Sequence, residues 1–411
     1  MPRGFMLILG VIVLGTIAAF VAGGTLQVAA PPPPAPGIAA PPAEQRPVEV
    51  SLAAVGDFLM HLPVVNSTRD AATGAYDFDS LFTDVHPLLA GADYTAANLE
   101  TRLAGPGPGY QGYPLFNTPD DLAPAMRRLG IDLVTTANNH SMDMGWRGIV
   151  ATLDCLDRAG VAHVGTYRSA AEREKPFVVE VRGVRLGILN YTATTNGLPL
   201  PAEHPYAVAN LEEQQVSADL ARLRALDPDL IIAFVHWGTE YRRGPDPQQR
   251  EWADKLARMG VDLIIGQHPH VVQPIERLDL RTADDRARTC FVVYSLGNFI
   301  SNQRWRYSDS GIILHVGVTR DPARDVAEVT SVSYTPVWVD TFTAAGRRHY
   351  RVLPVPKALA DYEAGLDGLL TAEDYQRLQE VRRELADLLD RPEWGIAPHE
   401  TTDPAARGSQ A

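Results

Sequence analysis

Val261-Asp262-Leu263-Ile264-Ile265-Gly266-Gln267-His268-Pro269-His270 is the stretch that decides the fold class, because an apolar run of strand length ends in two potential metal ligands. In an α/β sheet, functional groups gather beyond the carboxyl ends of the strands. Alternate residues of an extended chain share a face, so we expect His268 and His270 to point the same way. The stretch therefore predicts a buried strand that delivers two imidazoles to a site.

Four further apolar runs end in the same manner. Asp57 follows residues 48–55, Glu100 follows 92–97, Asn139 and His140 follow 131–136, and His236 follows 230–235. Any one of these residues alone is more often an ordinary polar residue at a strand end. Five such endings in one chain predict a single site that is rich in carboxylate and imidazole.

Three of the runs are preceded by a joint in which a segment with helical spacing is followed by glycine, an apolar residue and aspartate. The joints are Gly91 to Asp93, Gly130 to Asp132 and Gly260 to Asp262. A glycine after a helix supplies the left-handed residue of a C-cap, so each joint is expected to lead from a helix into a strand. Repeated joints of this kind predict an α/β domain.

Composition excludes several classes of protein. The chain has 411 residues, 45% of them hydrophobic, which is enough for a substantial core. Its formal charge of −13 argues against general nucleic-acid binding, which needs a basic surface. Cys155 and Cys290 are the only cysteines, so a disulfide scaffold and a cysteine metal cluster are excluded. Two buried small residues or a single bridge are the readings left open.

The amino-terminal segment predicts an envelope location. Residues 4–26 are apolar or neutral, only Arg3 precedes them, and no further charge occurs before Glu44. This length suits a single membrane-spanning helix, with a cleaved secretory signal as the alternative. Both predict that the bulk of the chain lies outside the cytoplasm, either held at the cell membrane or secreted.

The sequence divides into four parts. Residues 1–30 are the anchor or signal, the proline-rich residues 31–47 form an extended spacer, and residues 48–355 form one domain. Residues 356–411 are predicted to hold a charged amphipathic helix, Ala372–Asp390, with a solvated face, and a flexible tail. The glycine- and proline-rich loop of residues 105–114 is either an overhang of the site or an ordinary surface connection.

The candidate ligands predict the class of metal. Mixed carboxylate, amide and imidazole donors without thiolate suit manganese, zinc or iron. The six donors, Asp57, Glu100, Asn139, His236, His268 and His270, are enough for one or two divalent ions. Two ions are held about 4 Å apart where a carboxylate bridges them, and such a pair activates water for hydrolysis.

Taken together, the motifs resemble a known family. They are Gly56-Asp57, Asn98-Leu99-Glu100-Thr101, Ala137-Asn138-Asn139-His140-Ser141-Met142-Asp143-Met144-Gly145, His236-Trp237-Gly238-Thr239-Glu240-Tyr241, His268-Pro269-His270-Val271 and Ser295-Leu296-Gly297-Asn298-Phe299. Their order over residues 48–299 resembles the CapA-type poly-γ-glutamate capsule biosynthesis proteins. That family is similar in turn to the calcineurin-like metallophosphoesterases, which implies a four-layer α/β/β/α sandwich.

The resemblance also implies roles for individual residues. Asp57 and His270 would hold the first metal, Glu100 would bridge, and Asn139, His236 and His268 would hold the second metal. His140 would be the catalytic residue, which protonates the leaving group or orients the transition state.

One position departs from the phosphoesterase pattern, which has a histidine two residues after the first aspartate. Leu59 occupies that position here, and the nearest histidine is His61. The first metal position is then incomplete, completed by His61, or filled by water.

Trp237, Glu240 and Asn298 lie in the resembling motifs without a ligand role. For each, contact with substrate competes with a supporting role as a core aromatic, an outer acceptor or a turn residue.

Three functions follow as hypotheses. The leading one is an envelope-associated CapA-like protein of poly-γ-glutamate or related capsule synthesis, acting as a metal-dependent hydrolase. The alternatives are a phosphodiesterase or nucleotidase, and a non-catalytic polymer-binding or synthase-assembly factor. The expected partners are an anionic surface polymer or phosphoester, the membrane through the amino-terminal segment, and membrane-bound synthase subunits. Leu59 favours the assembly factor, whereas His140 favours an enzyme.

Overall fold

The computed structural model describes residues 46–399 except 282–284, 286 and 325. The predicted anchor or signal and nearly all of the proline-rich spacer lie outside the described residues, so their roles stay predictions. Within the described part of the chain, no helix combines the length and the apolar character that a membrane crossing requires.

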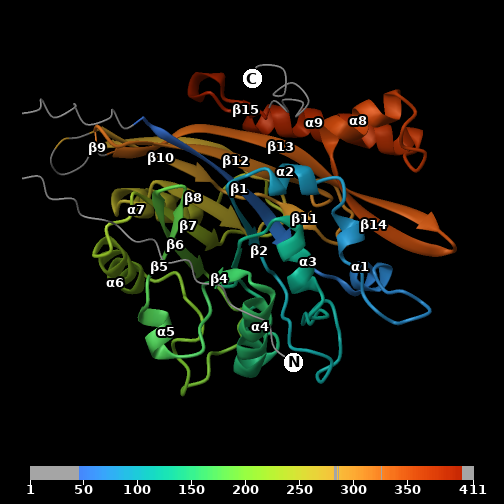
Figure 1. Ribbon diagram of the computed structural model, residues 1–411, viewed down its shortest axis with the longest axis horizontal. Coiled ribbons are helices and arrows are strands. Elements are labelled where there is room, and N and C mark those ends of the chain that lie inside the picture. The colour runs from blue at the N-terminus through green and yellow to red at the C-terminus, as the bar shows by residue number, and fades with distance from the viewer. Residues whose placement is uncertain (1–45, 282–284, 286, 325, 400–411) are drawn as a thin grey trace, which may run out of the picture. The chain divides into compact units, whose positions relative to one another are not determined.

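Two mixed β-sheets form the centre of the domain (Figure 1). The nine-stranded sheet contains β1 (Val48–Phe58), β2 (Tyr94–Asn98), β3 (Leu133–Thr135), β4 (Ala162–Val164), β11 (Asn298–Ile300), β12 (Ser310–Asp321), β13 (Val326–Ala344), β14 (Arg347–Pro354) and β15 (Ala397–Pro398). Strands β1 to β4 are parallel neighbours, and β12, β13 and β14 extend the sheet on the other side of β1 in antiparallel order.

The six-stranded sheet contains β5 (Phe177–Val181), β6 (Val184–Thr192), β7 (Leu230–His236), β8 (Leu263–Gln267), β9 (Ile275–Arg281) and β10 (Ala287–Val293). Strands β6, β7, β8 and β10 are parallel, and β5 and β9 are antiparallel edges. The predicted strands are therefore present, and the mixed sheets confirm the α/β class.

The helices with four or more residues are α1 (Leu62–Ser67), α2 (His86–Ala90), α3 (Leu122–Leu129), α4 (Gly145–Ala159), α5 (Ala170–Glu174), α6 (Glu213–Arg224), α7 (Pro247–Arg258), α8 (Val355–Glu363) and α9 (Ala372–Leu389). Buried side chains of α1 to α4 pack with the outer face of β1 to β3, and those of α6 and α7 pack with the outer face of β6 to β8. Each sheet thus has helices on its outer face.

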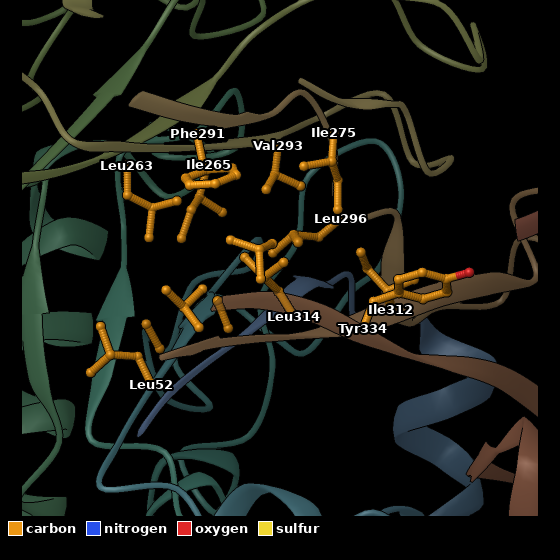
Figure 2. Close-up of a cluster of buried hydrophobic side chains, with 14 of the residues drawn as sticks. Leu52, Leu263, Ile265, Ile275, Phe291, Val293, Leu296, Ile312, Leu314 and Tyr334 are labelled. Atoms are coloured by element: carbon orange, nitrogen blue, oxygen red, sulfur yellow. The ribbon is translucent and has the colours of Figure 1, made fainter. Parts of the chain in front are cut away.

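The inner faces of the two sheets meet in one apolar cluster (Figure 2). Leu52 and Leu314 come from the nine-stranded sheet, and Ile265, Phe291 and Val293 come from the six-stranded sheet. Strands buried on both faces read as nearly continuous apolar runs, which is why the runs in this sequence show little alternation. This core holds the carboxyl ends of the two sets of parallel strands in proximity.

The three glycine joints share a structural role. The sequence predicted that each leads from a helix into a strand, but it did not predict the hydrogen bond made by each aspartate. In each of them the aspartate side chain accepts a hydrogen bond from a backbone N–H of the neighbouring strand region, as Asp93 does from Ser51, Asp132 from Thr95 and Asp262 from Ile231. The joints therefore fix one strand against the next.

Gly91 corrects the prediction of three left-handed caps. Gly130 and Gly260 have φ of 98° and 94°, as expected, whereas Gly91 has φ of −82°. A Cβ at Gly91 would lie 2.9 Å from the carbonyl oxygen of Pro87, so close approach to the short helix α2, rather than a left-handed turn, requires glycine there.

The carboxyl-terminal segment belongs to the same core. Helix α9 begins at the predicted Thr371 cap, where the side chains of Thr371 and Asp374 form a reciprocal capping box. Its buried residues Leu378, Val381 and Leu385 pack in the cluster between the sheets, and α8 and α9 lie against β13 (Figure 1). The described residues after α9 do not form a loose tail, since β15 pairs with β13.

Both cysteines are buried as free thiols, in α4 and β10. The single bridge that the sequence left open is absent, and the reading of two buried small residues is correct.

Candidate metal centre

The predicted ligands meet where the carboxyl ends of the parallel strands of both sheets converge. The nine-stranded sheet contributes Asp57 at the end of β1, Glu100 after β2, and Asn139 with His140 after β3. The six-stranded sheet contributes His236 at the end of β7, and His268 and His270 after β8. All seven side chains are buried.

The ligand atoms form groups of a size that suits a metal ion. Glu100, His236 and His268 place three such atoms within 4.8 Å of one another, and Asp57, Glu100 and His270 form a second group of the same kind. Glu100 is common to both groups. A carboxylate shared by two ligand groups is the arrangement that a bridging ligand requires.

Short distances connect the two sheets at the centre. Asp57 Oδ2 lies 3.0 Å from His270 Nδ1, and Asn139 Oδ1 lies 2.9 Å from His236 Nε2. Glu100 Oε1 lies 3.6 Å from His236 Nε2 and 3.7 Å from His270 Nε2. Each of these pairs joins a residue of the nine-stranded sheet to one of the six-stranded sheet.

Burial shifts the acid–base behaviour of the centre. Burial, reinforced by the charge of Asp57, raises the pKa of Glu100 well above its ordinary value. Burial and the neighbouring His268 lower the pKa of His236 well below its ordinary value. Burial also lowers the pKa of His268 to about 3. The imidazoles of His236 and His268 are therefore neutral near pH 7, as metal ligands must be.

The residues fit a divalent cation. Glu100 Oε1 and His268 Nδ1 are buried and have no hydrogen-bond partner among the described residues. A buried polar atom without a partner is costly, and a cation among carboxylate, amide and imidazole donors would satisfy such atoms. The absence of a thiolate in the groups agrees with manganese, zinc or iron.

Asn98, the first residue of the quoted Asn98-Leu99-Glu100-Thr101 motif, is an organising residue to which the sequence analysis gave no role. Its Nδ2 donates to Asp57 Oδ1 at 2.7 Å and to Glu100 Oε2 at 3.3 Å, and it lies 3.5 Å from His236 Nδ1. Asn138 Nδ2 in turn donates to Asn98 Oδ1 at 3.1 Å. The sequence feature that pointed to a role for Asn98 was its position immediately before Leu99-Glu100.

His140 is paired with Asp143, a residue of the quoted motif to which no role was given. His140 Nδ1 lies 2.7 Å from Asp143 Oδ2, which also accepts the backbone N–H of Phe116 at 2.7 Å. The Phe116 ring meets the His140 ring edge to face, with centroids 4.7 Å apart. Because the carboxylate oxygen accepts, Nδ1 carries the proton, and Nε2 is left for acid–base chemistry.

Arg102 is a second residue that the sequence analysis missed. Its side chain is fully buried, and Nη2 donates to the carbonyl oxygen of Leu99 at 2.9 Å. Burial lowers its pKa to about 10, against the opposing effect of Asp143 and Glu100. Arg102 therefore places a buried positive charge beside the carboxylates of the site.

The backbone around His268 and His270 is not extended, which corrects the reasoning that placed their side chains on one face. His268 has φ of 98° and His270 has φ of 58°, both in the left-handed region. The two rings nevertheless lie near each other, with centroids 5.9 Å apart. A strained turn, rather than strand periodicity, brings them together.

His61 lies near the centre but outside the ligand groups. Its Nδ1 is 3.2 Å from the carbonyl oxygen of Leu59 and accepts the backbone N–H of Asn302 at 3.3 Å. Its ring meets Phe116 edge to face at 5.2 Å, and burial lowers its pKa to about 4. In this arrangement the His61 ring is held by contacts with Leu59, Asn302 and Phe116 and belongs to none of the ligand groups that the described residues form.

The three residues without a predicted ligand role separate into two kinds. Trp237 and Asn298 are buried: Trp237 Nε1 donates to the carbonyl oxygen of Tyr294, and Asn298 Nδ2 donates to Gln303 Oε1. Both contacts lie within the framework of the fold, and contact of these two residues with substrate stays a prediction. Glu240 is exposed, and its carboxylate forms a third ligand group with His268 and His270.

The loop of residues 105–114 packs against the chain segments around His61 and Met144. A Cβ at Gly112 would lie 2.8 Å from the backbone nitrogen of Leu62, next to His61, so only glycine fits. Gln111 Nε2 lies 3.8 Å from Met144 Sδ, in the segment that follows Asp143. These contacts fix the loop beside these two segments, and an overhang of the site stays a prediction.

Comparison with known proteins identifies relatives in capsule synthesis. The family described as "Bacterial capsule synthesis protein PGA_cap" matches residues 51–303. The PGA biosynthesis protein CapA of Bacillus subtilis (strain 168) is 28% identical over 277 residues, 64% of this chain and 67% of that protein. The capsule biosynthesis protein CapA of Bacillus anthracis is 28% identical over 279 residues, 64% of this chain and 63% of that protein. The chain thus spans about two thirds of the length of these relatives.

Solved structures give weaker matches. The NAD nucleotidase of Haemophilus influenzae is 12% identical with a TM-score of 0.44, over 87% of this chain and 65% of that chain. A putative 5′-nucleotidase from Staphylococcus aureus is 14% identical with a TM-score of 0.41, over 83% and 58%. With TM-scores below 0.5, these two matches decide nothing about the fold or the site.

Proposed function

The chain belongs to the bacterial capsule synthesis protein family, and on this premise we propose that it serves capsule synthesis as a divalent-metal-dependent hydrolase of the metallophosphoesterase type. The observation that carries the proposal is the pair of ligand groups that share Glu100. The names of the Bacillus relatives support poly-γ-glutamate or a related anionic polymer as the material, with a phosphoester as the alternative substrate.

The chain's own residues would divide the metal binding between them. Asp57, Glu100 and His270 would hold one ion, and Glu100, Asn139, His236 and His268 would hold the other. When bound, divalent ions supply positive charge for the reacting oxygens and lower the pKa of water. Because burial raises the pKa of Glu100, metal binding to its carboxylate competes with protons and should weaken as the pH falls.

His140 and Asp143 would perform the proton transfer. The Asp143 carboxylate fixes the ring through Nδ1, and the backbone N–H of Phe116 fixes the carboxylate. In its imidazolium form, with Nδ1–H held by Asp143, His140 would donate the Nε2 proton to the leaving-group oxygen and return to the neutral Nδ1–H tautomer, and the Phe116 ring packs against one side of the imidazole. A scaffold that only binds metal or polymer has no need of this pair, which supports catalysis over the assembly-factor hypothesis.

The experiment is a comparison of His140→Ala with Asn139→Ala in the full-length purified protein. Metal is measured by mass spectrometry, and hydrolysis is measured with p-nitrophenyl phosphate and with oligo-γ-glutamate. We expect His140→Ala to retain the metal of the unmodified protein and to lose roughly 10²- to 10⁴-fold in rate, the contribution of a positioned histidine.

Asn139→Ala is the matched control, since the adjacent residue is a proposed ligand, and it should lose metal as well as rate. An unmodified protein that binds no divalent metal contradicts the proposal. A His140→Ala variant with unchanged rate and unchanged polymer output contradicts the catalytic role and favours an assembly factor.

A further inference from the structure

Tyr241 and Trp305 form an exposed aromatic pair beside the metal centre. Their side chains are 41% and 51% exposed, and their rings meet edge to face with centroids 5.2 Å apart. They come from two loops that are distant in the sequence, after β7 and after β11. A single exposed aromatic residue is ordinary, whereas two in contact form a continuous apolar surface.

The pair begins one side chain away from the proposed metal ligands. The Tyr241 ring centroid lies 6.0 Å from that of His270, and the backbone N–H of Tyr241 donates to the carbonyl oxygen of Pro269 at 2.8 Å. Pro269 lies between His268 and His270, so Tyr241 is tied directly to the turn that carries these two ligands. A group attached to a bond that reacts at the metals is therefore within reach of this surface.

Tyr241 is held in place by its backbone and its hydroxyl. Its φ of 64° lies in the left-handed region, which is unfavourable for a bulky residue and is found where surrounding contacts impose it. Gln303 Nε2 donates to the Tyr241 hydroxyl at 3.2 Å, and Asn298 Nδ2 donates to Gln303 Oε1 at 2.9 Å. The buried Asn298 therefore supports the surface indirectly.

The Trp305 loop is held by cation–π contacts and by helix α9. The Tyr307 ring lies 4.2 Å from the guanidinium carbon of Arg243 and 5.2 Å from that of Arg306. Arg306 forms an ion pair with Glu384 of α9, and Arg243 Nη2 donates to the Glu384 carbonyl oxygen at 2.8 Å. These contacts keep Trp305 exposed on a fixed loop.

We propose that Tyr241 and Trp305 form a stacking subsite for a ring in the group attached to the reacting ester, either a sugar ring or a nucleobase. The inference rests on the proposed hydrolase function and names its substrate class. Rings with a flat apolar face stack on aromatic side chains, whereas an open γ-glutamyl chain offers no ring.

Binding calorimetry on the full-length, metal-loaded protein tests this subsite. The His140→Ala background prevents turnover during the titration, and the probes are adenosine 5′-monophosphate, glucose 1-phosphate, glycerol 3-phosphate and oligo-γ-glutamate. We expect one of the two ring-bearing esters to bind more tightly than glycerol 3-phosphate. Tighter binding of glucose 1-phosphate identifies a hexose ring, and tighter binding of adenosine 5′-monophosphate identifies a nucleoside.

Trp305→Leu keeps an apolar side chain but removes the ring, and we expect it to weaken binding of the preferred ring-bearing ester roughly tenfold. Trp305→Phe should restore most of that loss. Metal content and melting temperature should be unchanged in both variants, because Trp305 is exposed and is not a ligand. Leu366→Ala, an exposed apolar residue between α8 and α9, is the control and should change no affinity.

Equal binding of all three phosphoesters, or an unchanged affinity in Trp305→Leu, overturns the subsite. So does a preference for oligo-γ-glutamate that Trp305→Leu does not alter. The proposed function fails differently, through absent metal or absent hydrolysis in the protein with His140 intact. The calorimetric preference for a ring requires no turnover, so the two failures are distinguishable.

Discussion

The two sheets supply chemically different halves of the candidate metal centre. The nine-stranded sheet provides the carboxylates and the amide, Asp57, Glu100 and Asn139, whereas the six-stranded sheet provides the imidazoles, His236, His268 and His270. Each predicted metal position draws on both halves, because Glu100 lies in both ligand groups. The comparison teaches that neither sheet holds a complete site and that docking of the sheets creates it.

The two halves are also destabilised in different ways, one by the burial of carboxylates close together and the other by backbone strain. On the nine-stranded side the carboxylates of Asp57 and Glu100 are buried close together, and Asn98 donates to both of them. On the six-stranded side the backbone at His268 and His270 is left-handed, which costs on the order of 1–3 kcal/mol for each residue. A bound cation would offset both costs, since it neutralises the carboxylates and engages the imidazoles.

The largest expected effect comes from a substitution that weakens the packing between the two sheets and leaves every proposed ligand unchanged. Leu314 is fully buried in the cluster between them, and Leu314→Ala should lower the free energy of unfolding by roughly 2–5 kcal/mol. Denaturant unfolding followed by far-UV and near-UV circular dichroism measures this change. We expect the two signals to shift together, because both sheets share the core. A shift of one signal alone would mean that the sheets are stabilised independently.

A second prediction separates the metal affinity of the carboxylate half from its stability. Glu100→Gln should weaken metal binding by at least about 100-fold, the upper end of the effect of changing an outer partner of a ligand. In metal-free protein at pH 7.5 the same variant should melt higher than the unmodified protein, because it removes a buried carboxylate whose pKa is raised.

His268→Ala is the matched change in the imidazole half. It should also lose metal, but without the gain in metal-free stability, since His268 is already neutral at pH 7.5. Equal melting temperatures for metal-free Glu100→Gln and His268→Ala would contradict the distinction between the two halves.

The smallest effect concerns pH, and the two halves respond with opposite sign. The pKa of His268 is about 3 in the folded protein against an ordinary value of 6.5, so its contribution to stability is lost as the pH falls below 6.5. Between pH 6.5 and pH 5 this amounts to roughly 2 kcal/mol for one such histidine. Glu100, with a raised pKa, instead lowers metal-free stability as the pH rises above its unfolded value.

Thermal melts of metal-free protein from pH 5 to pH 8 measure the two slopes. Replacing His268 should flatten the acid side, and Glu100→Gln should flatten the neutral side. Saturating divalent metal should reduce the pH dependence near neutrality and be released as the pH falls, because protons compete for its ligands. A melting temperature that is independent of pH in the metal-free protein would contradict the buried, shifted groups on which this prediction depends.

The sequence by itself determined the strands and the residues at their ends. Five predicted runs are strands in the structure: β1, β2, β3, β7 and β8, which precede or contain Asp57, Glu100, Asn139, His236 and His268 in that order. Their apolar character and length are local properties, and these are enough to predict a buried strand. The same logic placed the ligands at one edge, since the carboxyl ends of parallel strands lie on one side of a sheet.

Only the tertiary structure decided which ligands meet and what surrounds them. The pairing of His140 with Asp143, the bridging amide of Asn98 and the contact of Tyr241 with Trp305 depend on loop paths that have no periodic pattern. The left-handed turn at His268 and His270 likewise replaced the extended chain that periodicity suggested. Helix α9 had an amphipathic pattern that predicted its bounds, but Glu384 reaches the Trp305 loop only because the helix docks beside β13. Contacts between distant segments are set by how the two sheets pack, and that packing is a property of the whole core rather than of any local stretch.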